Sequence, residues 1–287
     1  MGDTVSELGP RAGRRSGVLG DPISHSLSPA LHRAGYAALG LDWAYDAHRV
    51  PAGGLSDFLS DVVGSDSSWR GLSLTMPLKR EALGLADLVS DRAVAAGAAN
   101  TLVIDSGRVL ADNTDVPGVL AAIRERCPDE MHSASILGGG ATAGSVLLAL
   151  AESGCREFQI QVRSPARAAQ TLAVAERFSA SLKVRVVGLA EAPVGDIVVS
   201  TIPASAQTPE LAVGAARLPV VFDVVYDPWP TPIASAGYAA GAIVVGGLDL
   251  LVHQAALQFA IFTNLAAPLA AMRRAAETAA AETTSQN

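Results

Sequence analysis

The chain has 287 residues, of which 49% are hydrophobic, and this length is enough for two modest domains with apolar cores. Its formal net charge of −7 argues against a nucleic-acid partner, because binding to phosphate backbones requires a basic surface. No apolar run reaches the roughly 18 residues that a membrane-spanning helix needs. Cys127, Cys155 and the five histidines follow no disulfide or metal-ligand spacing, so we expect a cytoplasmic protein without a bound metal.

Short apolar runs alternate with helical stretches in the first half of the chain, a pattern typical of an α/β protein. Residues 1–15 are polar and glycine-rich, and we expect them to form a flexible tail. The strands expected in this half cover residues 17–20, 43–50, 71–75, 100–104 and 108–111. The expected helices cover residues 29–39 and 53–63, a stretch after Pro77, and residues 117–126.

The second half contains continuous Val- and Ile-rich runs, which indicate strands that are buried on both faces of a parallel sheet. These strands are expected at residues 134–137, 158–162, 184–187, 197–201, 220–225 and 243–245. The helices between and after them are expected at residues 142–152, 166–178 and 249–265. The Ala- and Glu-rich end, residues 275–287, is expected to be a helix that frays into a flexible tail from residue 276.

A glycine-rich turn, Gly138-Gly139-Gly140-Ala141-Thr142-Ala143, follows the first of these strands and opens a helix. This G-x-G-x-x-A pattern is typical of dinucleotide binding. Its first glycine permits a tight turn, its second lets the backbone approach a pyrophosphate, and its small last residue lets the helix pack closely on the strand. The helix N-terminus then offers free N–H groups to the phosphates. A plain tight turn is the alternative interpretation.

The end of the following strand indicates which dinucleotide is bound. An acidic residue there would bond the ribose of NAD, but this sequence has Arg163 and, just beyond, Arg167. A guanidinium can grip the oxygens of a 2′-phosphate, so NADP is favoured over NAD. Alternatively, both arginines are solvated residues at a helix start.

Polar residues also gather at predicted strand ends in the first half. Ser26 and Ser28 could both bond one carboxylate, although Ser28 could instead be the N-cap of a helix that begins at Pro29. Lys79 follows a strand that ends near a proline, where a lysine is usually solvated. Asp115 closes a polar cluster that could be an ordinary turn. If these two approach each other, the carboxylate could hold an ammonium that protonates a forming alkoxide.

These segments, in this order, resemble the shikimate dehydrogenase family from about residue 17 to residue 270. The matching motifs are H-S-x-S-P at 25–29, the strand and lysine at 73–79, A-x-N-T at 98–101, D-N-T-D at 112–115, the glycine-rich turn at 138–143, Y-x-P-x-x-T-P at 226–232, and Gly246 with the Q-A-A segment at 254–256. Ser73 stands where the family has Asn, and Val162 stands where it has Asn before the arginine.

The resemblance implies an N-terminal α/β substrate domain and a Rossmann-like dinucleotide-binding domain with a cleft between them. Residues 16–115, joined by the C-terminal helix 248–275, would bind the substrate, and residues 116–247 would bind NADP. Lys79 and Asp115 would be the catalytic pair. The residues expected to bind the substrate are Ser26, Ser28, Ser73, Thr75, Asn100, Tyr226 and Gln254. The residues expected to bind the cofactor are Gly138, Gly139, Gly140, Ala141, Thr142, Ala143, Arg163, Arg167, Thr201, Ile202, Val224 and Gly247.

The implied activity is the reversible NADPH-dependent reduction of 3-dehydroshikimate to shikimate, in aromatic amino acid biosynthesis. Two alternatives stay open at this point: an NAD-dependent quinate/shikimate dehydrogenase and a non-catalytic NADP-binding protein on the same fold. Either a monomer or a homodimer is compatible with the family.

Overall fold

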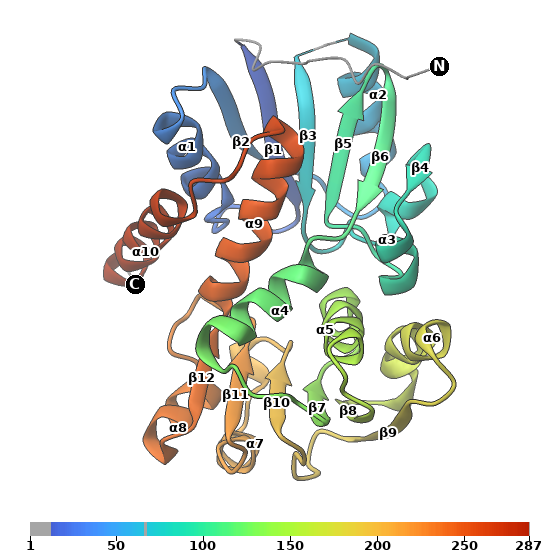
Figure 1. Cartoon of the computed structure of the whole chain (residues 1–287), viewed down its shortest axis with the longest axis vertical. Coiled ribbons are helices and arrows are strands. Elements are labelled where there is room, and N and C mark those ends of the chain that lie inside the picture. The colour runs from blue at the N-terminus through green and yellow to red at the C-terminus, as the bar shows by residue number, and fades with distance from the viewer. Residues whose placement is uncertain (1–12, 66–67, 287) are drawn as a thin grey trace.

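A computed structural model, which describes residues 13–65 and 68–286, contains two six-stranded sheets (Figure 1). The strands of the first sheet are β1 (Arg14–Gly20), β2 (Trp43–Arg49), β3 (Trp69–Leu74), β4 (Leu88–Val89), β5 (Thr101–Asp105) and β6 (Arg108–Asp112). Those of the second sheet are β7 (Ser133–Leu137), β8 (Glu157–Val162), β9 (Lys183–Gly188), β10 (Ile197–Ser200), β11 (Val220–Asp223) and β12 (Ile243–Gly246). The α/β fold class predicted from the sequence is confirmed.

The first sheet is mixed and has the strand order β2-β1-β3-β5-β6-β4. Strand β1 pairs in parallel with β2 and β3, whereas β5 runs antiparallel to β3 and β6. Alternate side chains of a strand point to opposite faces of the sheet, and helices cover both faces. Leu19 packs with helix α2 (Leu55–Ser65) on one face, and Val18 packs with α1 (Ser28–Ala38) on the other.

The second sheet is parallel throughout, with the strand order β12-β11-β10-β7-β8-β9. The order reverses beside β7, the first strand of this sheet along the chain. Ligands of such sheets bind at this switch point, at the carboxyl ends of the strands. Ile136 of β7 and Ile160 of β8 are fully buried, as helices on both faces require. The helices of this half are α5 (Ala141–Glu152), α6 (Ala169–Phe178), α7 (Pro209–Ala215) and α8 (Pro232–Ala240).

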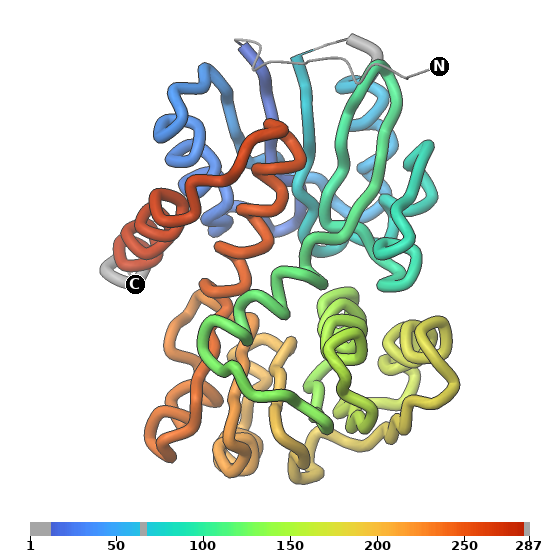
Figure 2. Tube along the Cα trace, viewed as in Figure 1, coloured from blue at the N-terminus to red at the C-terminus, as the bar shows by residue number. Residues whose placement is uncertain are grey.

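Two helices connect the sheets, α4 (Asp115–Arg126) on the outward path and α9 (Gly247–Thr263) on the return (Figure 1). They pack against each other so closely that a Cβ atom at Gly118 would lie 2.9 Å from the Cβ atom of Gln254. After α9, helix α10 (Leu269–Gln286) packs on α1, so the C-terminal segment lies beside the N-terminal one (Figure 2). The chain therefore returns to the sheet where it started.

The structure differs from the predicted elements at both ends of the chain. Arg14 and Arg15 already pair with β2, so the tail predicted over residues 1–15 is too long; residues 1–12 lie outside the described range. The helix predicted over residues 275–287 is present as the second half of α10, which continues to Gln286, and its fraying stays a prediction. Burial of Ala276 against the first half of the chain, together with the high helix propensity of an Ala- and Glu-rich segment, accounts for this helix.

Several short elements were missed between the predicted ones. They are β4, α3 (Asp91–Ala96), α7 and α8. The last two each begin at a Thr-Pro pair, in which the hydroxyl of Thr208 or Thr231 accepts a hydrogen bond from the helix backbone. The stretch after Pro77 contains only the single 3-10 turn Glu81–Gly84. Within the described ranges, no helix combines the length and apolar character that crossing a bilayer requires.

Candidate functional site

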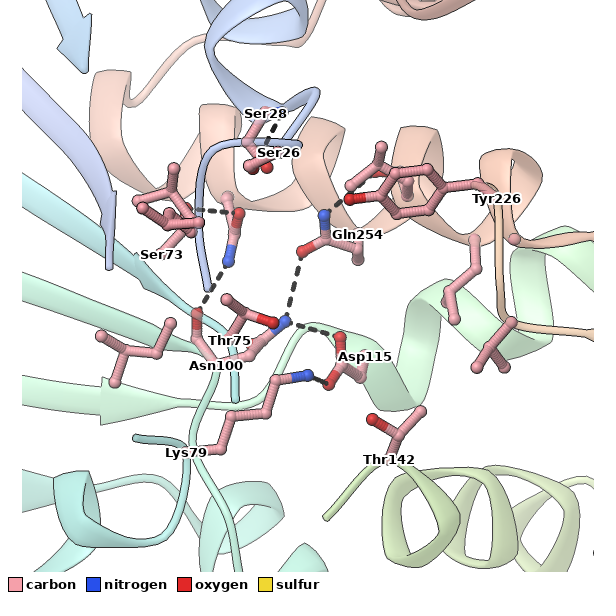
Figure 3. A pocket seen from close by; sticks show the side chains of 18 of the residues that line it. Ser26, Ser28, Ser73, Thr75, Lys79, Asn100, Asp115, Thr142, Tyr226 and Gln254 are labelled. Atoms are coloured by element: carbon pink, nitrogen blue, oxygen red, sulfur yellow. Dashed lines mark hydrogen bonds and ion pairs between the residues drawn. The ribbon is translucent and has the colours of Figure 1, made fainter. Parts of the chain in front are cut away.

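A cavity of about 250 Å³ lies between the two sheets, where the carboxyl ends of β1, β3 and β6 face the start of α5 (Figure 3). Its lining includes every residue predicted from the sequence to bind or act on the substrate: Ser26, Ser28, Ser73, Thr75, Lys79, Asn100, Asp115, Tyr226 and Gln254. It also includes three of the predicted cofactor residues, Thr142, Val224 and Gly247. Segments that are far apart in the sequence thus meet at one place.

Lys79 and Asp115 form an ion pair in this cavity, with 2.5 Å between Nζ of the lysine and Oδ2 of the aspartate. Their side chains are only 14% and 6% exposed, so the interpretation of Lys79 as an ordinary solvated lysine is wrong. Lys79 enters the site through the turn that follows β3, and Asp115 is the first residue of α4, where the helix dipole favours a negative charge. The pair places an ammonium, which can donate a proton, beside a carboxylate at the cavity wall.

The second carboxylate oxygen of Asp115 is held by Asn100, whose Nδ2 donates to Oδ1 over 2.8 Å. The orientation of this amide is fixed from the other side, since the backbone N–H of Thr114 donates to Oδ1 of Asn100 over 2.7 Å. A backbone N–H can only donate, so Nδ2 must face Asp115. Both oxygens of Asp115 therefore have charged or fixed partners, and the carboxylate has a defined position.

Gln254 and Tyr226 complete the wall opposite Lys79 (Figure 3). Nε2 of Gln254 donates to the carbonyl of Leu251 over 3.0 Å, while its Oε1 accepts from Asn100 over 3.2 Å. Burial raises the pKa of Tyr226, as does the charge of Asp227, and a hydrogen bond with the backbone of Leu27 opposes both only in part. Tyr226 therefore stays a neutral phenol that can donate to an anion.

Ser26 lies in the turn before α1 and Ser28 is the first residue of the helix, and both line the cavity. The helix begins at Ser28, with Leu27 in the N-cap position, so the alternative interpretation of Ser28 as the N-cap is wrong. The backbone N–H of Ser28 donates to Oγ of Ser26 over 3.4 Å instead. The Ser28 hydroxyl therefore does not cap its own helix and can bond a different group.

Ser73, at the end of β3, bonds two side chains that sequence reasoning missed. The hydroxyl of Tyr45 donates to Oγ of Ser73 over 2.6 Å, and Oγ of Ser73 donates to Oε1 of Gln258 over 2.7 Å. Gln258 also lines the cavity. It lies one turn after Gln254 on α9, and this i, i+4 spacing places both on one helix face, a signal that the sequence did contain.

Two positions of the glycine-rich turn tolerate no side chain, and a third faces open space. Gly138 has a φ of +111°, which side chains other than glycine rarely allow, and a Cβ atom at Gly139 would lie 1.9 Å from the carbonyl oxygen of Arg167. A Cβ atom at Gly140 would meet nothing within 4 Å. Because glycine has no side chain to cap α5, the first N–H groups of this helix stay available to an anion.

The remaining predicted cofactor residues surround this turn or lie on the surface beside it. Ala143, in the first turn of α5, is fully buried. Thr201 lies beside Gly138, and its hydroxyl donates to the carbonyl of Leu137 over 2.8 Å. Arg163 and Arg167, after β8, are exposed and so can reach an anion outside the fold. Gly139, Gly140, Ala141 and Ile202 complete this set, whose contacts with a cofactor stay a prediction.

Among the residues that the structure describes, no group of three or more His, Cys, Asp or Glu side chains is arranged to hold a metal ion. The site instead combines a paired ammonium, two fixed amides and several hydroxyls beside a helix N-terminus. Such a set can bind a hydroxylated carboxylic acid and transfer a proton next to a dinucleotide.

Comparison with known families gives two matches. Residues 18–102 match the shikimate dehydrogenase substrate binding domain, and residues 247–277 match the shikimate 5′-dehydrogenase C-terminal domain. Among curated proteins, the chain is 36% identical over 250 residues to a shikimate dehydrogenase (NADP(+)) of Methylobacterium radiotolerans, which covers 84% of this chain and 88% of the relative.

Solved structures of similar proteins share the whole fold. Shikimate dehydrogenase of Mycobacterium tuberculosis has a TM-score of 0.82 at 38% identity, over 92% of this chain and 99% of its own. Shikimate 5-dehydrogenase of Thermus thermophilus, solved in complex with NADP(H) and shikimate, has a TM-score of 0.80 at 35% identity, over 93% and 99% of the two chains.

Proposed function

Because the chain belongs to the shikimate dehydrogenase family, we propose that its cavity catalyses the reversible, NADPH-dependent reduction of 3-dehydroshikimate to shikimate. This reaction is a step of the shikimate pathway to the aromatic amino acids. The observation that carries the proposal is the Lys79–Asp115 ion pair, which lies in the cavity between the two sheets, with Thr142 at the start of α5 in the same lining.

Lys79 has the central role in the proposed reaction. When bound, NADPH supplies the hydride that C3 of the substrate accepts. As negative charge develops on the carbonyl oxygen, Nζ of Lys79 donates a proton or a hydrogen bond to it, and the product is the C3 alcohol. One carboxylate oxygen of Asp115 is bonded by Lys79 and the other by Asn100. Asp115 thereby keeps the ammonium directed at the carbonyl oxygen of the substrate. In the reverse direction the same groups accept the proton.

The other cavity residues would hold the substrate against this pair. Ser26, Ser28 and Tyr226 line the cavity, and their hydroxyls can donate to a carboxylate. Thr75, Asn100, Ser73 and Gln254 also line the cavity and suit ring hydroxyls. Orientation of this kind is worth several orders of magnitude in rate, because the reacting atoms are held in contact.

The glycine-rich turn and its neighbours would hold NADP. The N–H groups at the start of α5 would bond the pyrophosphate, and Arg163 and Arg167 would bond the 2′-phosphate. The proposal is supported by the open space at Gly140 and by the exposed position of both arginines. We also propose that residues 16–115 with the helix 248–275 form the substrate-binding domain and residues 116–247 the NADP-binding domain. The free, buried thiols of Cys127 and Cys155 support a cytoplasmic location, and the protein would be a monomer or a homodimer.

Absorbance at the nicotinamide band tests the proposed function directly. Oxidation of shikimate and of quinate is measured with NADP⁺ and with NAD⁺, and shikimate with NADP⁺ is expected to give the highest kcat/KM. A higher value for quinate with NAD⁺ would identify the alternative quinate/shikimate dehydrogenase. Tight NADPH binding without turnover of any pair would instead indicate a non-catalytic protein.

A further inference from the structure

Ser73 lines the cavity, and its hydroxyl bonds two buried side chains of the protein, Tyr45 and Gln258. Tyr45 of β2 donates to Oγ over 2.6 Å, and Oγ donates to Oε1 of Gln258 over 2.7 Å. Ser73, Tyr45 and Gln258 are all buried, so water does not compete for these bonds. The three residues come from β3, β2 and α9 and form one continuous chain of hydrogen bonds.

The direction of every bond in this chain is fixed by a backbone carbonyl. Nε2 of Gln258 lies 2.9 Å from the carbonyl oxygen of Asn100 and 3.0 Å from Oγ1 of Thr101. A carbonyl can only accept, and the hydroxyl of Thr101 already donates to Oδ1 of Asn100 over 2.8 Å. Both hydrogens of the Gln258 amide are therefore used on this side, so its oxygen must face Ser73.

The hydrogen of the Ser73 hydroxyl is consequently committed to Gln258. A hydroxyl oxygen has two acceptor lone pairs, and one of them is used by Tyr45. Burial raises the pKa of Tyr45, so its phenol stays protonated and keeps donating. The ring of His32 stacks on that of Tyr45 with 4.1 Å between centroids, which holds the phenol in place. What Ser73 can offer to the cavity is a single acceptor.

We propose that Gln258 and Tyr45 are positioning residues that make Ser73 an obligate hydrogen-bond acceptor, and that this wall of the cavity thereby selects a substrate with a donating ring hydroxyl at the facing carbon. A keto, ether or halogen substituent there would bring two acceptors together. The inference rests on the proposed function, because it names the group of the shikimate ring that the same cavity recognises. It concerns a ring position other than the reacting one.

The test uses three substrates with NADP⁺: shikimate and its 4-deoxy-4-fluoro and 5-deoxy-5-fluoro analogues. Fluorine has a size close to that of a hydroxyl but cannot donate. For the wild-type chain, kcat/KM is expected to fall about tenfold to hundredfold for the analogue whose fluorine faces Ser73, because a buried acceptor loses its partner. The inductive effect of fluorine is common to all variants, so changes in this ratio between variants report on the hydrogen bond.

Gln258→Met removes the partner that holds the Ser73 hydrogen, and the freed hydroxyl can then rotate its hydrogen toward the cavity. The ratio between shikimate and the sensitive analogue is expected to fall to about threefold or less. Ser73→Ala should give the same collapse, since the acceptor itself is gone. Tyr36→Phe is the matched control, because Tyr36 is buried in the same cluster but does not line the cavity; it should keep the wild-type ratio.

Three results separate the possibilities. A Gln258→Met variant that loses kcat/KM equally for all three substrates would reduce Gln258 to a structural role and overturn the proposal; Gln258→Leu serves the same purpose if the methionine variant does not fold. Wild-type protein that oxidises shikimate and both analogues alike would also overturn it. Wild-type protein that does not oxidise shikimate at all would instead contradict the proposed function.

Discussion

At the scale of single residues, the proposed chemistry depends on an ammonium that is held in place by a carboxylate and shielded from solvent. The sequence left open whether Lys79 and Asp115 meet, because 36 residues separate them and each has an ordinary surface interpretation. The structure brings them within 2.5 Å. The roles that we propose for them can be tested by removing the amine.

Lys79→Ala is expected to lower kcat for shikimate oxidation by a factor of at least ~10², with a much smaller change in the substrate KM, since the lost interaction develops mainly in the transition state. Steady-state kinetics and circular dichroism of the folded variant provide the measurement. A large rise in KM with kcat intact would show that Lys79 binds the substrate and does not assist the chemistry.

Arg163→Ala is expected to raise the KM for NADP⁺ and to leave the KM for NAD⁺ almost unchanged. One charge-assisted hydrogen bond is worth about 1.5–3 kcal/mol, which corresponds to roughly ten- to a hundredfold in affinity. Arg177→Ala is a suitable control, since Arg177 donates to the carbonyl of Ala95 instead. Equal effects on the two cofactors would remove Arg163 from recognition of the 2′-phosphate.

All nine residues that the resemblance implied for substrate binding or catalysis line the cavity. The resemblance did not point to Gln258 or Tyr45. Their contribution arises from tertiary packing: Tyr45 lies on β2 and Gln258 on α9, 213 residues apart, and both reach Ser73. A sequence pattern can predict which residues share a face of one element, such as Gln254 and Gln258 on a helix. It does not show directly which elements contact each other in the fold. The hydrogen-bond direction at Ser73 follows only from the three-dimensional arrangement.

At the scale of elements, the glycine-rich turn serves two different purposes at adjacent positions. A Cβ atom at Gly139 would collide with the carbonyl oxygen of Arg167, whereas one at Gly140 would project into open space. Gly139→Ala is therefore expected to destabilise the fold by about 1–3 kcal/mol, because packed backbone must move. Gly140→Ala should leave stability nearly unchanged and raise the KM for NADP⁺, because the added methyl group occupies space for the phosphates.

Thermal unfolding and cofactor titration of these two variants form the measurement. The result that would contradict this account is the reverse assignment, with Gly140→Ala unstable and Gly139→Ala affecting the cofactor alone. The sequence predicted the turn and its helix correctly, but it assigned every glycine to the cofactor. The packing role of Gly139 could not be foreseen, since the contacting carbonyl belongs to the 3-10 turn Pro165–Ala168.

Asp249 lies in the first turn of α9 and joins three helices through its carboxylate. It accepts hydrogen bonds from Arg126 of α4, from the backbone of Gly246 and from Arg273 of α10. Burial alone would raise the pKa of Asp249, but these hydrogen bonds and the charge of Arg126 outweigh burial and hold the pKa below its usual range.

A carboxylate with a lowered pKa stabilises the folded state above the unfolded-state pKa of about 3.9, and this contribution is lost as pH falls through the lower folded-state pKa. Asp249→Asn should therefore reduce the free energy of unfolding at pH 7 by about 1.5–3 kcal/mol, and the difference from wild type should shrink below about pH 4. Urea unfolding at pH 7 and at pH 3 measures both. A difference that is the same at both pH values would exclude a role for the charge of Asp249.

At the scale of the whole molecule, the site exists because two sheets present the carboxyl ends of their strands to each other. The alternation of apolar runs predicted the α/β class and most strands, since Val- and Ile-rich segments of a parallel sheet are distinctive. The ends of the chain were predicted less well. Whether Ala276 is buried depends on the position of α1, and composition alone cannot show that.

The chain crosses between the sheets through α4 and returns through α9, and both helices carry residues that line the cavity. Asp115 opens α4, and Gly247, Gln254 and Gln258 lie along α9. A change in the relative position of the sheets would therefore move residues that we propose to bind the substrate and residues that we propose to bind the cofactor at the same time. This arrangement suits a reaction in which two molecules must be held face to face.

A crystal structure of the chain with shikimate and NADP⁺ tests the central claim most directly. We expect the C3 oxygen of shikimate to lie about 2.6–3.2 Å from Nζ of Lys79, on the side of the cavity that faces Thr142 and the start of α5. Shikimate bound in that cavity with its C3 oxygen turned away from Lys79, or bound elsewhere on the molecule, would contradict the account.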